Sequence, residues 1–398
     1  MITLIGCIVC MEIKSKTIDK NEFVIDDFTP GKPLRIYDKD GNWKDYNNEK
    51  LVGDKLHHFK GWKCGAGTLS MHVGFHGEVT VGSYSCKWGV NSPKSIKEQK
   101  LRNIKHEYGV NILGNVFDDF NLPTDWITCE QKECICGADL FIPKAKTKKD
   151  LDLLRKTQYL YTDFSKRTKK DFEIVAMEKS FLPGYKKQIY WDLSLSCNYA
   201  CSYCWQHDKK EKYNTYEQLM EATNKIEDKF IKGENCNFCI SGGEPTFQPG
   251  YMDWVKYLFN KGYYVSSHSN GSNKPEVYKE LIYYSDLNIS VHFEFYKSER
   301  LLKVLDTITQ EKVKNDNKGV KHLEVKLMFR PGIREELLWF ERQIHQIPNF
   351  TDYCTLSIVP LVGPYKYEPK ESYFKEKEYD VIEKYYTDND KELFGDRN

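Results

Sequence analysis

The sequence predicts an α/β chain in which a small β-rich region with clustered cysteines precedes a larger domain of alternating strands and helices. Three observations support this expectation. Short apolar runs and turn residues fill the first 145 residues, strand and helix patterns alternate from residue 186, and most cysteines gather in two groups. With 398 residues, of which 40% are hydrophobic, the chain is long enough for two or three domains.

The composition narrows the classes of function. The 59 Lys and Arg residues nearly cancel the 58 Asp and Glu residues, so no strong overall field would attract a polynucleotide or an acidic lipid. The 13 cysteines, in a chain without a recognisable secretion signal, favour metal ligands in a reducing compartment over disulfides. The apolar N-terminal run is too short to span a bilayer. We therefore expect a cytoplasmic protein with no membrane partner and no polynucleotide partner.

The N-terminal region, residues 1–145, is expected to consist of small antiparallel strands. Its first sixty residues give no indication of function. Residues 61–86 predict a β-hairpin, because alternating apolar residues lead into a turn at Gly77 and out again. A cysteine lies near each outer end of this hairpin, and antiparallel pairing would bring Cys64 and Cys86 together.

A tight turn at residues 129–136 supplies three more thiols. These are Cys129, Cys134 and Cys136. Five cysteines could thus converge, which is enough to ligate one iron–sulfur cluster and leave one to spare. The alternative is a structural zinc ion, for which four thiolates would suffice. The four would be Cys64, Cys86, Cys134 and Cys136.

The second domain, residues 186–364, shows six βα units, the pattern of a parallel sheet. The predicted strands are Gln188–Ser194, Asn237–Ser241, Tyr263–His268, Leu287–Phe293, Leu323–Phe329 and Thr355–Leu361. The predicted helices are Tyr216–Ile231, Tyr251–Lys261, Glu276–Tyr284, Glu299–Val313 and Arg334–His345. A helical linker is expected at residues 146–185 and a helical tail at residues 365–398.

The first strand of this domain ends in a CxxxCxxC pattern formed by Cys197, Cys201 and Cys204. A short loop of this kind can fold three thiolates around one face of a cubic iron–sulfur cluster and leave the fourth iron without a protein ligand. A structural zinc site normally has four protein ligands, and no second CxxC pair follows at zinc-finger spacing. Zinc, or thiols without any metal, is the alternative interpretation.

These residues resemble the radical S-adenosylmethionine (SAM) superfamily, whose CxxxCxxC signature has an aromatic residue, here Tyr203, before its last cysteine. The family's GGEP sequence is matched by Gly242, Gly243, Glu244 and Pro245. The resemblance implies a partial (β/α)6 barrel, in which the three cysteines hold a 4Fe-4S cluster that binds SAM. It also implies that the two glycines let the backbone approach the SAM amino group, and that Glu244 accepts a hydrogen bond from it.

Further candidates follow or close the later strands, where the loops of a parallel barrel converge. Ser269 and Asn270 resemble the family's Ser/Thr-Asn-Gly loop near SAM, although an ordinary Asn-Gly turn is the alternative. Ser290 and His292 lie where the family commonly places polar residues against the SAM ribose or the substrate. Arg330 could pair with the SAM carboxylate, or it could simply belong to a turn.

The N-terminal hairpin and cysteine turn resemble the SPASM and Twitch auxiliary-cluster domains of radical SAM enzymes. Two departures are evident: such domains usually follow the barrel, and a full SPASM set would need more than five cysteines. The resemblance therefore implies one Twitch-like 4Fe-4S cluster, with zinc as the alternative.

The resemblance thus implies a radical SAM enzyme that reductively cleaves SAM to a 5′-deoxyadenosyl radical, using a flavodoxin- or ferredoxin-type electron donor. The expected substrate is a peptide or protein side chain, or a small metabolite, and a nucleotide or nucleoside is the alternative. The alternative outside the enzymes is a non-catalytic redox-sensing protein that binds an iron–sulfur cluster or zinc. The intact CxxxCxxC and GGEP motifs disfavour that alternative.

Overall fold

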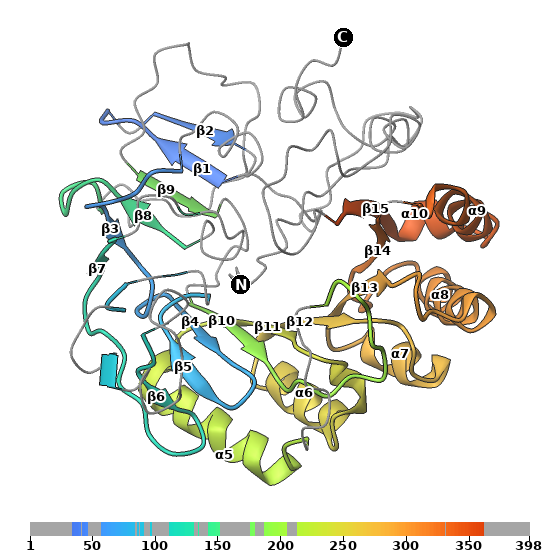
Figure 1. Cartoon of the computed structure of the whole chain (residues 1–398), viewed down its shortest axis with the longest axis horizontal. Helices are drawn as coiled ribbons and strands as arrows, with labels where there is room; N and C mark the ends of the chain where they lie inside the picture. Colours follow the sequence, from blue (N-terminus) through green and yellow to red (C-terminus); the bar gives the residue numbers. More distant parts are fainter. Residues whose placement is uncertain are drawn as a thin grey trace. The chain divides into compact units, whose positions relative to one another are not determined.

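The structure is a computed structural model of the chain (Figure 1). It describes residues 34–40, 42–46, 57–83, 86, 88–90, 96–97, 111–130, 134, 142–151, 176–179, 187–204, 213–330 and 332–361. These residues divide into two units. The first unit holds the described residues from 34 to 190 together with 222–236, and the second holds those of 191–221 and 237–361.

The first unit contains an antiparallel six-stranded sheet with the order β2-β1-β9-β8-β3-β7. Its strands are β1 Leu34–Tyr37, β2 Trp43–Tyr46, β3 Lys63–Cys64, β7 Ile127–Thr128, β8 Lys144–Ala145 and β9 Ala176–Lys179. In β3, Cys64 stands opposite both Ile127 and Lys144. Directly opposed residues of an antiparallel ladder share a face of the sheet, so these three side chains lie on the same face.

Of the hairpin predicted over residues 61–86, the inner part forms, between β4, Ser70–Val73, and β5, Glu78–Thr80, with Val73 opposite Val79. The outer part is wrong, because Cys64 lies in β3 and pairs with β7 and β8 instead of with the chain near Cys86. Its turn is closed by a hydrogen bond from the Gly77 N–H to the Gly74 carbonyl at 2.9 Å. Gly77 has φ +79°, and a β carbon there would lie 2.6 Å from the Phe117 ring, so glycine is required. The strand β6, Gly114–Asn115, pairs with the other side of β5.

The second unit is organised around a parallel sheet with the strand order β15-β14-β13-β12-β11. Its strands are β11 Cys236–Ser241, β12 Tyr264–Ser269, β13 Asp286–Val291, β14 Leu323–Phe329 and β15 Thr355–Pro360. The strand β10, Lys187–Asp192, runs from the first unit into the second. Just after it, the Leu193 N–H donates to the Ser241 carbonyl at 2.9 Å.

Helices follow the strands as the sequence predicted. They are α5 Tyr216–Ile226, α6 Tyr251–Asn260, α7 Pro275–Leu281, α8 Ser298–Lys314, α9 Arg334–His345 and the short α10 Phe350–Tyr353. The predicted bounds of β14 and α9 are confirmed, and most others differ by a few residues. The helix predicted to reach Ile231 instead ends in a π-helical turn, Glu227–Ile231, which the left-handed Lys232 terminates.

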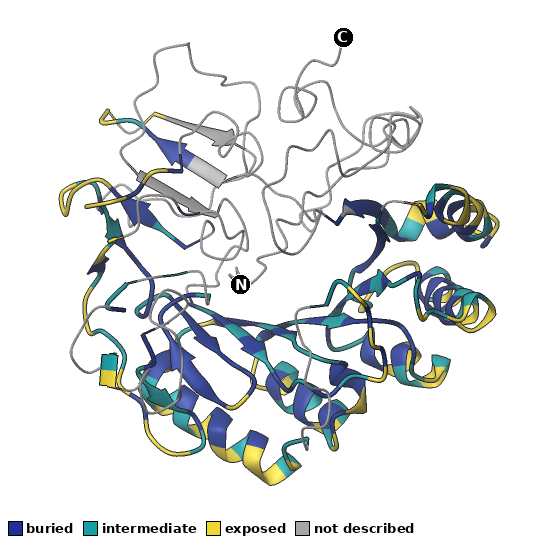
Figure 2. Ribbon diagram, in the orientation of Figure 1, coloured by how far each residue is buried: buried dark blue, intermediate teal, exposed yellow. Residues whose placement is uncertain are grey.

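Alternating side chains give the parallel sheet one apolar face and one polar face. In β13, Leu287, Ile289 and Val291 are fully buried, whereas Ser290 lies on the other face (Figure 2). His292, two residues further on, continues the same alternation. The predicted shared face of Ser290 and His292 therefore agrees with the pleat of this strand.

One part of the predicted linker is wrong. Residues 176–179 form β9, which pairs with both β1 and β8, so long-range pairing outweighs any local helical pattern there. Residues 152–175 and 180–185 of that linker and the predicted tail at 365–398 lie outside the described residues. In the described part of the chain, no helix has both the length and the apolar character needed to cross a membrane.

Candidate functional site

Cys197, Cys201 and Cys204 lie in the loop that follows β10. Cys201 is buried and the other two are half-buried. The Cys204 N–H donates to the Cys201 carbonyl at 3.0 Å, which forms a tight turn between these two ligand candidates. The Tyr199 N–H and the Asn270 side-chain amide lie 3.4 Å and 3.7 Å from the Cys197 sulfur. Donors at these positions favour the thiolate, the form that binds metal.

The Glu244 carboxylate is fully buried and ties the GGEP segment to the loop after β12. Its Oε2 accepts the Asn270 N–H at 2.6 Å, and its Oε1 accepts the Ser269 hydroxyl at 2.7 Å. The Thr246 hydroxyl and N–H also donate to Oε1, at 2.6 Å and 3.2 Å. Burial raises the pKa of Glu244, and these hydrogen bonds oppose that rise. The carboxylate thus fixes the position of two loops.

The two glycines of the GGEP segment allow a close approach within the chain itself. Gly242 and Gly243 both have positive φ, at +90° and +48°. A β carbon on Gly243 would lie 2.0 Å from the Ser196 carbonyl oxygen. The Glu244 N–H donates to that same carbonyl at 2.9 Å. The glycines therefore let this segment pack directly against the residues that precede Cys197. Pro245 then begins the short 3-10 helix Pro245–Phe247.

Asn270 connects the Glu244 loops with the cysteine loop. Its side-chain amide donates to the Asn198 Oδ1 at 2.9 Å, in addition to its contact with Cys197. Asn198 in turn donates to the Ser272 hydroxyl at 2.9 Å. The predicted site residues Ser269, Asn270 and Cys197 are therefore brought together by one hydrogen-bonded chain.

Tyr203 and His292 form a stacked and hydrogen-bonded pair. The Tyr203 hydroxyl lies 2.8 Å from the His292 Nδ1, and the ring centroids are 5.8 Å apart. The Tyr203 ring also packs against the buried cluster of Met328, Val359 and Leu361. Burial raises the pKa of the Tyr203 hydroxyl, so it stays protonated and can donate. This pair joins the cysteine loop to the end of β13.

Glu294 holds the same loop from a second side. Its carboxylate accepts the Ser202 N–H at 2.6 Å and also the Ser202 hydroxyl, and the Arg330 Nε lies 3.5 Å away. Burial acts to raise the pKa of Glu294, but the hydrogen bonds from Ser202 and the charge of Arg330 outweigh it and lower the pKa. Arg330, predicted to face the SAM carboxylate, is thus placed beside a carboxylate of the chain.

The remaining candidate, Ser290, stands opposite Lys326 of β14. Lys326 forms a buried ion pair with Glu324 at 3.2 Å, and the Ser357 hydroxyl donates to Glu324 at 3.0 Å. The polar face of the parallel sheet therefore carries fixed charges. No sequence motif indicated these charged residues, since isolated Lys and Glu residues are common in any sequence.

Sequence analysis missed several residues of this site. They are Asn198, Tyr199, Ser202, Ser272 and Glu294. Asn198, Tyr199 and Ser202 lie between the three cysteines, and that position was the available signal. Nothing in the sequence distinguishes Ser272 or Glu294, because their partners are distant along the chain.

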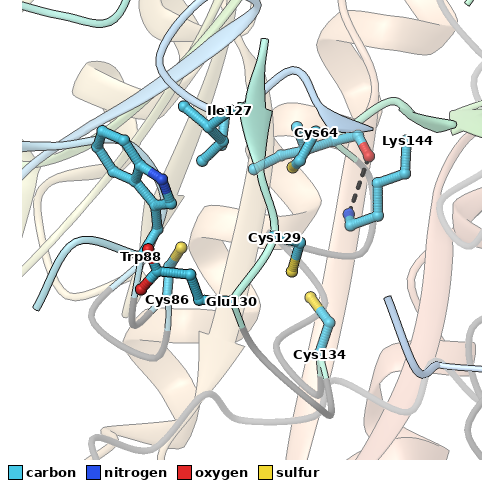
Figure 3. Close-up of a pocket in the computed structure, with 10 residues that line it drawn as sticks. Cys64, Cys86, Trp88, Ile127, Cys129, Glu130, Cys134 and Lys144 are labelled. Carbon is cyan, nitrogen blue, oxygen red and sulfur yellow. Dashed lines mark hydrogen bonds between the residues drawn. The ribbon is translucent and has the colours of Figure 1, made fainter. Parts of the chain in front are cut away.

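In the first unit, four of the five cysteines predicted to bind a second metal group line one pocket (Figure 3). They are Cys64, Cys86, Cys129 and Cys134. Figure 3 shows the sulfur atoms of Cys129 and Cys134 directed toward one another. The predicted fifth ligand, Cys136, lies outside the described residues.

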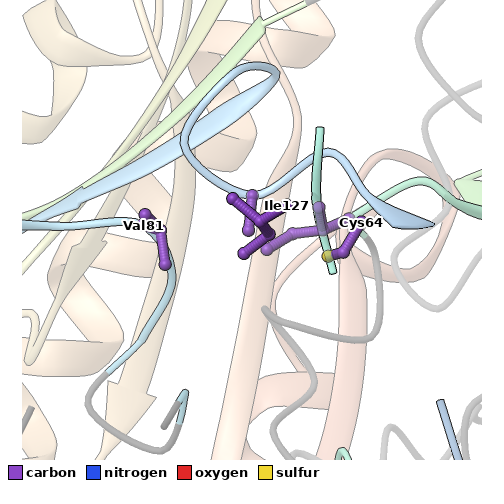
Figure 4. Packing of buried hydrophobic residues seen from close by; sticks show 5 residues of the cluster. Cys64, Val81 and Ile127 are labelled. Atoms are coloured by element: carbon purple, nitrogen blue, oxygen red, sulfur yellow. The ribbon is translucent and has the colours of Figure 1, made fainter. Parts of the chain in front are cut away.

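The pleat of the six-stranded sheet explains why two of these cysteines lie on the same face. Cys64 stands opposite Ile127, and Cys129 is two residues further along, so both cysteines are on one face. The Cys129 N–H donates to the Trp62 carbonyl at 2.8 Å, which continues the pairing beyond β7. Cys64, Val81 and Ile127 belong to one buried cluster, against which Cys86 and Cys129 pack (Figure 4).

Four thiols in an apolar pocket are a donor set suited to iron–sulfur clusters and to zinc. Within the described residues, no three or more His, Cys, Asp or Glu side chains are arranged as ligands of a single metal ion. The identity of a group in this pocket, and in the loop of Cys197, is therefore a proposal.

Residues 192–330 match the family model described as the Radical SAM superfamily. The match includes every residue described for the site around Cys197 except Ser357, Val359 and Leu361, and it does not reach the pocket of four cysteines. The family implies a 4Fe-4S cluster and SAM. A curated relative from Pyrococcus furiosus, named tungsten-containing aldehyde ferredoxin oxidoreductase cofactor-modifying protein, is 26% identical over 181 residues. That alignment covers 42% of this chain and 48% of the relative, so the chain spans about half the length of the curated relative.

Two crystal structures of Streptococcus suis SuiB are also similar. The complex with the precursor peptide SuiA has a TM-score of 0.35, and the complex with S-adenosylmethionine has one of 0.36. Both are 12% identical to this chain and cover 50% of it, which corresponds to 45% and 47% of the SuiB chains. A likeness of this size carries no argument about substrate.

Proposed function

We propose that this chain is a radical SAM enzyme that cleaves SAM reductively at a 4Fe-4S cluster, because residues 192–330 match the Radical SAM superfamily model. Cys197, Cys201 and Cys204 would hold this cluster. The observation that carries the proposal is the position of Asn270, whose side-chain amide reaches the Cys197 sulfur while its backbone N–H is fixed by Glu244. The cysteine loop and the GGEP segment thereby form one site.

The bound cluster would supply the electron that divides SAM into methionine and a 5′-deoxyadenosyl radical, which can abstract hydrogen from an unactivated C–H bond. Three cysteine ligands leave one iron of the cluster open for the amino and carboxylate groups of SAM. The chain contributes ligation, orientation and a site from which water is excluded. A flavodoxin- or ferredoxin-type protein is the proposed electron donor.

The chain's own residues would orient SAM. The backbone at Gly242 and Gly243 is proposed to approach the SAM amino group, with Glu244 as its acceptor. Because the Glu244 carboxylate already accepts four hydrogen bonds, this second role would require it to share an oxygen. We propose that Ser290 and His292 face the ribose or the substrate.

For Arg330, two roles are compatible with its position. Its ion pair with Glu294 supports a role in holding the cysteine loop, and a SAM carboxylate could approach the same guanidinium. We further propose that β10 to β15 and their helices form a partial (β/α)6 barrel, which the parallel order of β11 to β15 supports.

The pocket of four cysteines is proposed to hold a second, Twitch-like 4Fe-4S cluster that binds the substrate or removes an electron after hydrogen abstraction. The convergence of Cys64, Cys86, Cys129 and Cys134 supports a tetrathiolate site. Zinc is the alternative occupant, and it would have a structural role only.

The proposed substrate is a peptide or protein side chain, or a small metabolite. The name of the Pyrococcus furiosus relative, a cofactor-modifying protein, supports the small-molecule part of this proposal. The balanced charge of the chain, 59 Lys and Arg against 58 Asp and Glu, gives no electrostatic support for a polynucleotide.

Deuterium transfer tests the substrate class. Reduced enzyme and SAM are incubated anaerobically with deuterated candidate peptides, small metabolites and nucleotides. Deuterium in 5′-deoxyadenosine from a peptide or a small metabolite is the expected result. Deuterium from a nucleotide alone would overturn the proposed substrate class.

A further inference from the structure

A lysine is buried in the wall of the pocket of four cysteines. Lys144 is 1% exposed, and its Nζ donates to the Ile142 carbonyl at 2.9 Å (Figure 3). The same ammonium lies 5.2 Å from the centre of the Phe59 ring. Lysine is rarely this deeply buried, and contacts such as these two offset part of the cost of burying its ammonium.

The sheet directs this lysine toward the thiols. Lys144 of β8 stands opposite Cys64 of β3, so the two side chains share a face and their β carbons are close. Cys129 reaches the same face from the other side of β3. The neighbouring Lys63 is on the opposite face, where its Nζ donates to the Thr128 hydroxyl at 2.9 Å. Strand pairing therefore directs Lys144 into the pocket and Lys63 to the opposite face of the sheet.

A fixed positive charge at this position would act on a bound cluster. Four thiolates carry four negative charges, against a 4Fe-4S core of about +2 when oxidised and about +1 when reduced. The reduced site is thus the more negative of the two, and a nearby cation stabilises it more. Glu130 also lines this pocket, where its carboxylate accepts the Gly89 N–H, but most of the lining atoms are apolar. The charge interaction is therefore screened less than it would be in water. The net effect is a higher reduction potential.

We infer that Lys144 compensates the charge of the second cluster and raises its reduction potential, which makes that cluster a better acceptor of an electron from the substrate. The inference rests on the proposal that the four cysteines hold a 4Fe-4S cluster. Lys144 is not proposed as a ligand, and it acts only through its charge and its position beside Cys64.

The test uses the full-length chain with Cys197, Cys201 and Cys204 changed to alanine, so that only the second cluster remains after anaerobic reconstitution. In this background Lys144→Met removes the charge at similar volume, and Lys144→Arg keeps it. Lys63→Met is the matched control on the opposite face. The reduction potential is measured by a redox titration monitored by electron paramagnetic resonance, and iron and zinc are counted in each sample.

Lys144→Met should shift the potential to a lower value, whereas Lys144→Arg and Lys63→Met should leave it close to that of the parent. An unchanged potential in Lys144→Met with full iron content would overturn the inference and leave the second cluster in place. A parent that holds zinc, or no metal, would overturn the proposed cluster itself.

If Lys144→Met holds no iron, iron retention decides the question instead. Charge compensation then predicts that Lys144→Arg retains the cluster. Loss of iron from both variants, with Lys63→Met unaffected, would overturn the inference.

Discussion

The Glu244 carboxylate accepts the backbone N–H of Asn270 at 2.6 Å, although the two residues belong to loops that follow different strands. The Asn270 side chain then reaches the Cys197 sulfur. Through the Asn270 N–H, Glu244 thus helps to determine where a hydrogen-bond donor to Cys197 lies. This relationship couples the stability of the loops to the geometry of the proposed cluster site.

Changing Glu244 to glutamine tests this coupling. The amide keeps one acceptor oxygen but replaces the other by an NH2 group, which faces buried donors. We expect a loss of about 1–3 kcal/mol in the free energy of unfolding, together with a lower iron content. Thermal unfolding under anaerobic conditions measures the first effect. The exposed Glu276→Gln is the control, and equal melting temperatures for the two variants would contradict the coupling.

Changing Glu294 to alanine should loosen the cysteine loop, because the Ser202 N–H and hydroxyl lose their acceptor. A displacement of about 1 Å at a reacting centre costs about 100-fold in rate, so we expect SAM cleavage to fall by at least about tenfold. Arg330→Gln removes the 3.5 Å ion pair but leaves both hydrogen bonds from Ser202, so its effect through the loop should be smaller. A loss of SAM cleavage as large as that of Glu294→Ala would instead support the proposed contact between Arg330 and the SAM carboxylate. Product formation by liquid chromatography measures both. Wild-type rates in Glu294→Ala would show that Glu294 does not position the loop.

The lowered pKa of His268 predicts how the free energy of unfolding depends on pH. Burial, with a smaller contribution from the Lys326 charge, lowers the pKa of His268 from 6.5 to about 3, while Asp192 acts in the opposite direction. The folded chain therefore keeps this imidazole neutral, 3.5 Å from the Cys239 sulfur, at a pH where the unfolded chain binds a proton. The contribution of His268 to the free energy of unfolding is fully present above pH 6.5. It is lost as the pH falls toward 3, by about 1 kcal/mol per pH unit.

Denaturant unfolding at pH 6.5 and 5.5 checks this dependence. His268→Gln should lose less stability between the two pH values than the wild type does. His345→Gln, at a position whose side chain is 42% exposed, should behave like the wild type. Equal pH dependence in His268→Gln and the wild type would contradict the lowered pKa of this half-buried imidazole.

Much of the parallel-sheet unit could be predicted, because each strand and helix carries its own local pattern. The bounds of β14 and α9 illustrate this. Glu244 and Asn270 were singled out as candidates because they belong to short motifs at strand ends. Long-range pairing was not predictable. The strand β9 depends on β1 and β8, and Lys144 was not recognised because only its pairing with Cys64 turns it inward. Glu294 was missed for the same reason.

Metal analysis tests the two proposed cluster sites. We expect about eight irons per chain after anaerobic reconstitution, and about four when Cys197, Cys201 and Cys204 are all changed to alanine. Iron and zinc are determined together in each sample. About four irons and one zinc in the wild type would identify the pocket of Cys64 as a structural zinc site and remove its proposed electron-accepting role.

The central claim is that the site around Cys197 cleaves SAM, and the most direct measurement is 5′-deoxyadenosine formation by the anaerobically reconstituted chain with dithionite and SAM. The wild type should form 5′-deoxyadenosine and methionine. Cys201→Ala should form neither, because Cys201 is proposed to bind one of the three protein-ligated irons. A reconstituted wild type that binds SAM but never cleaves it would contradict the account.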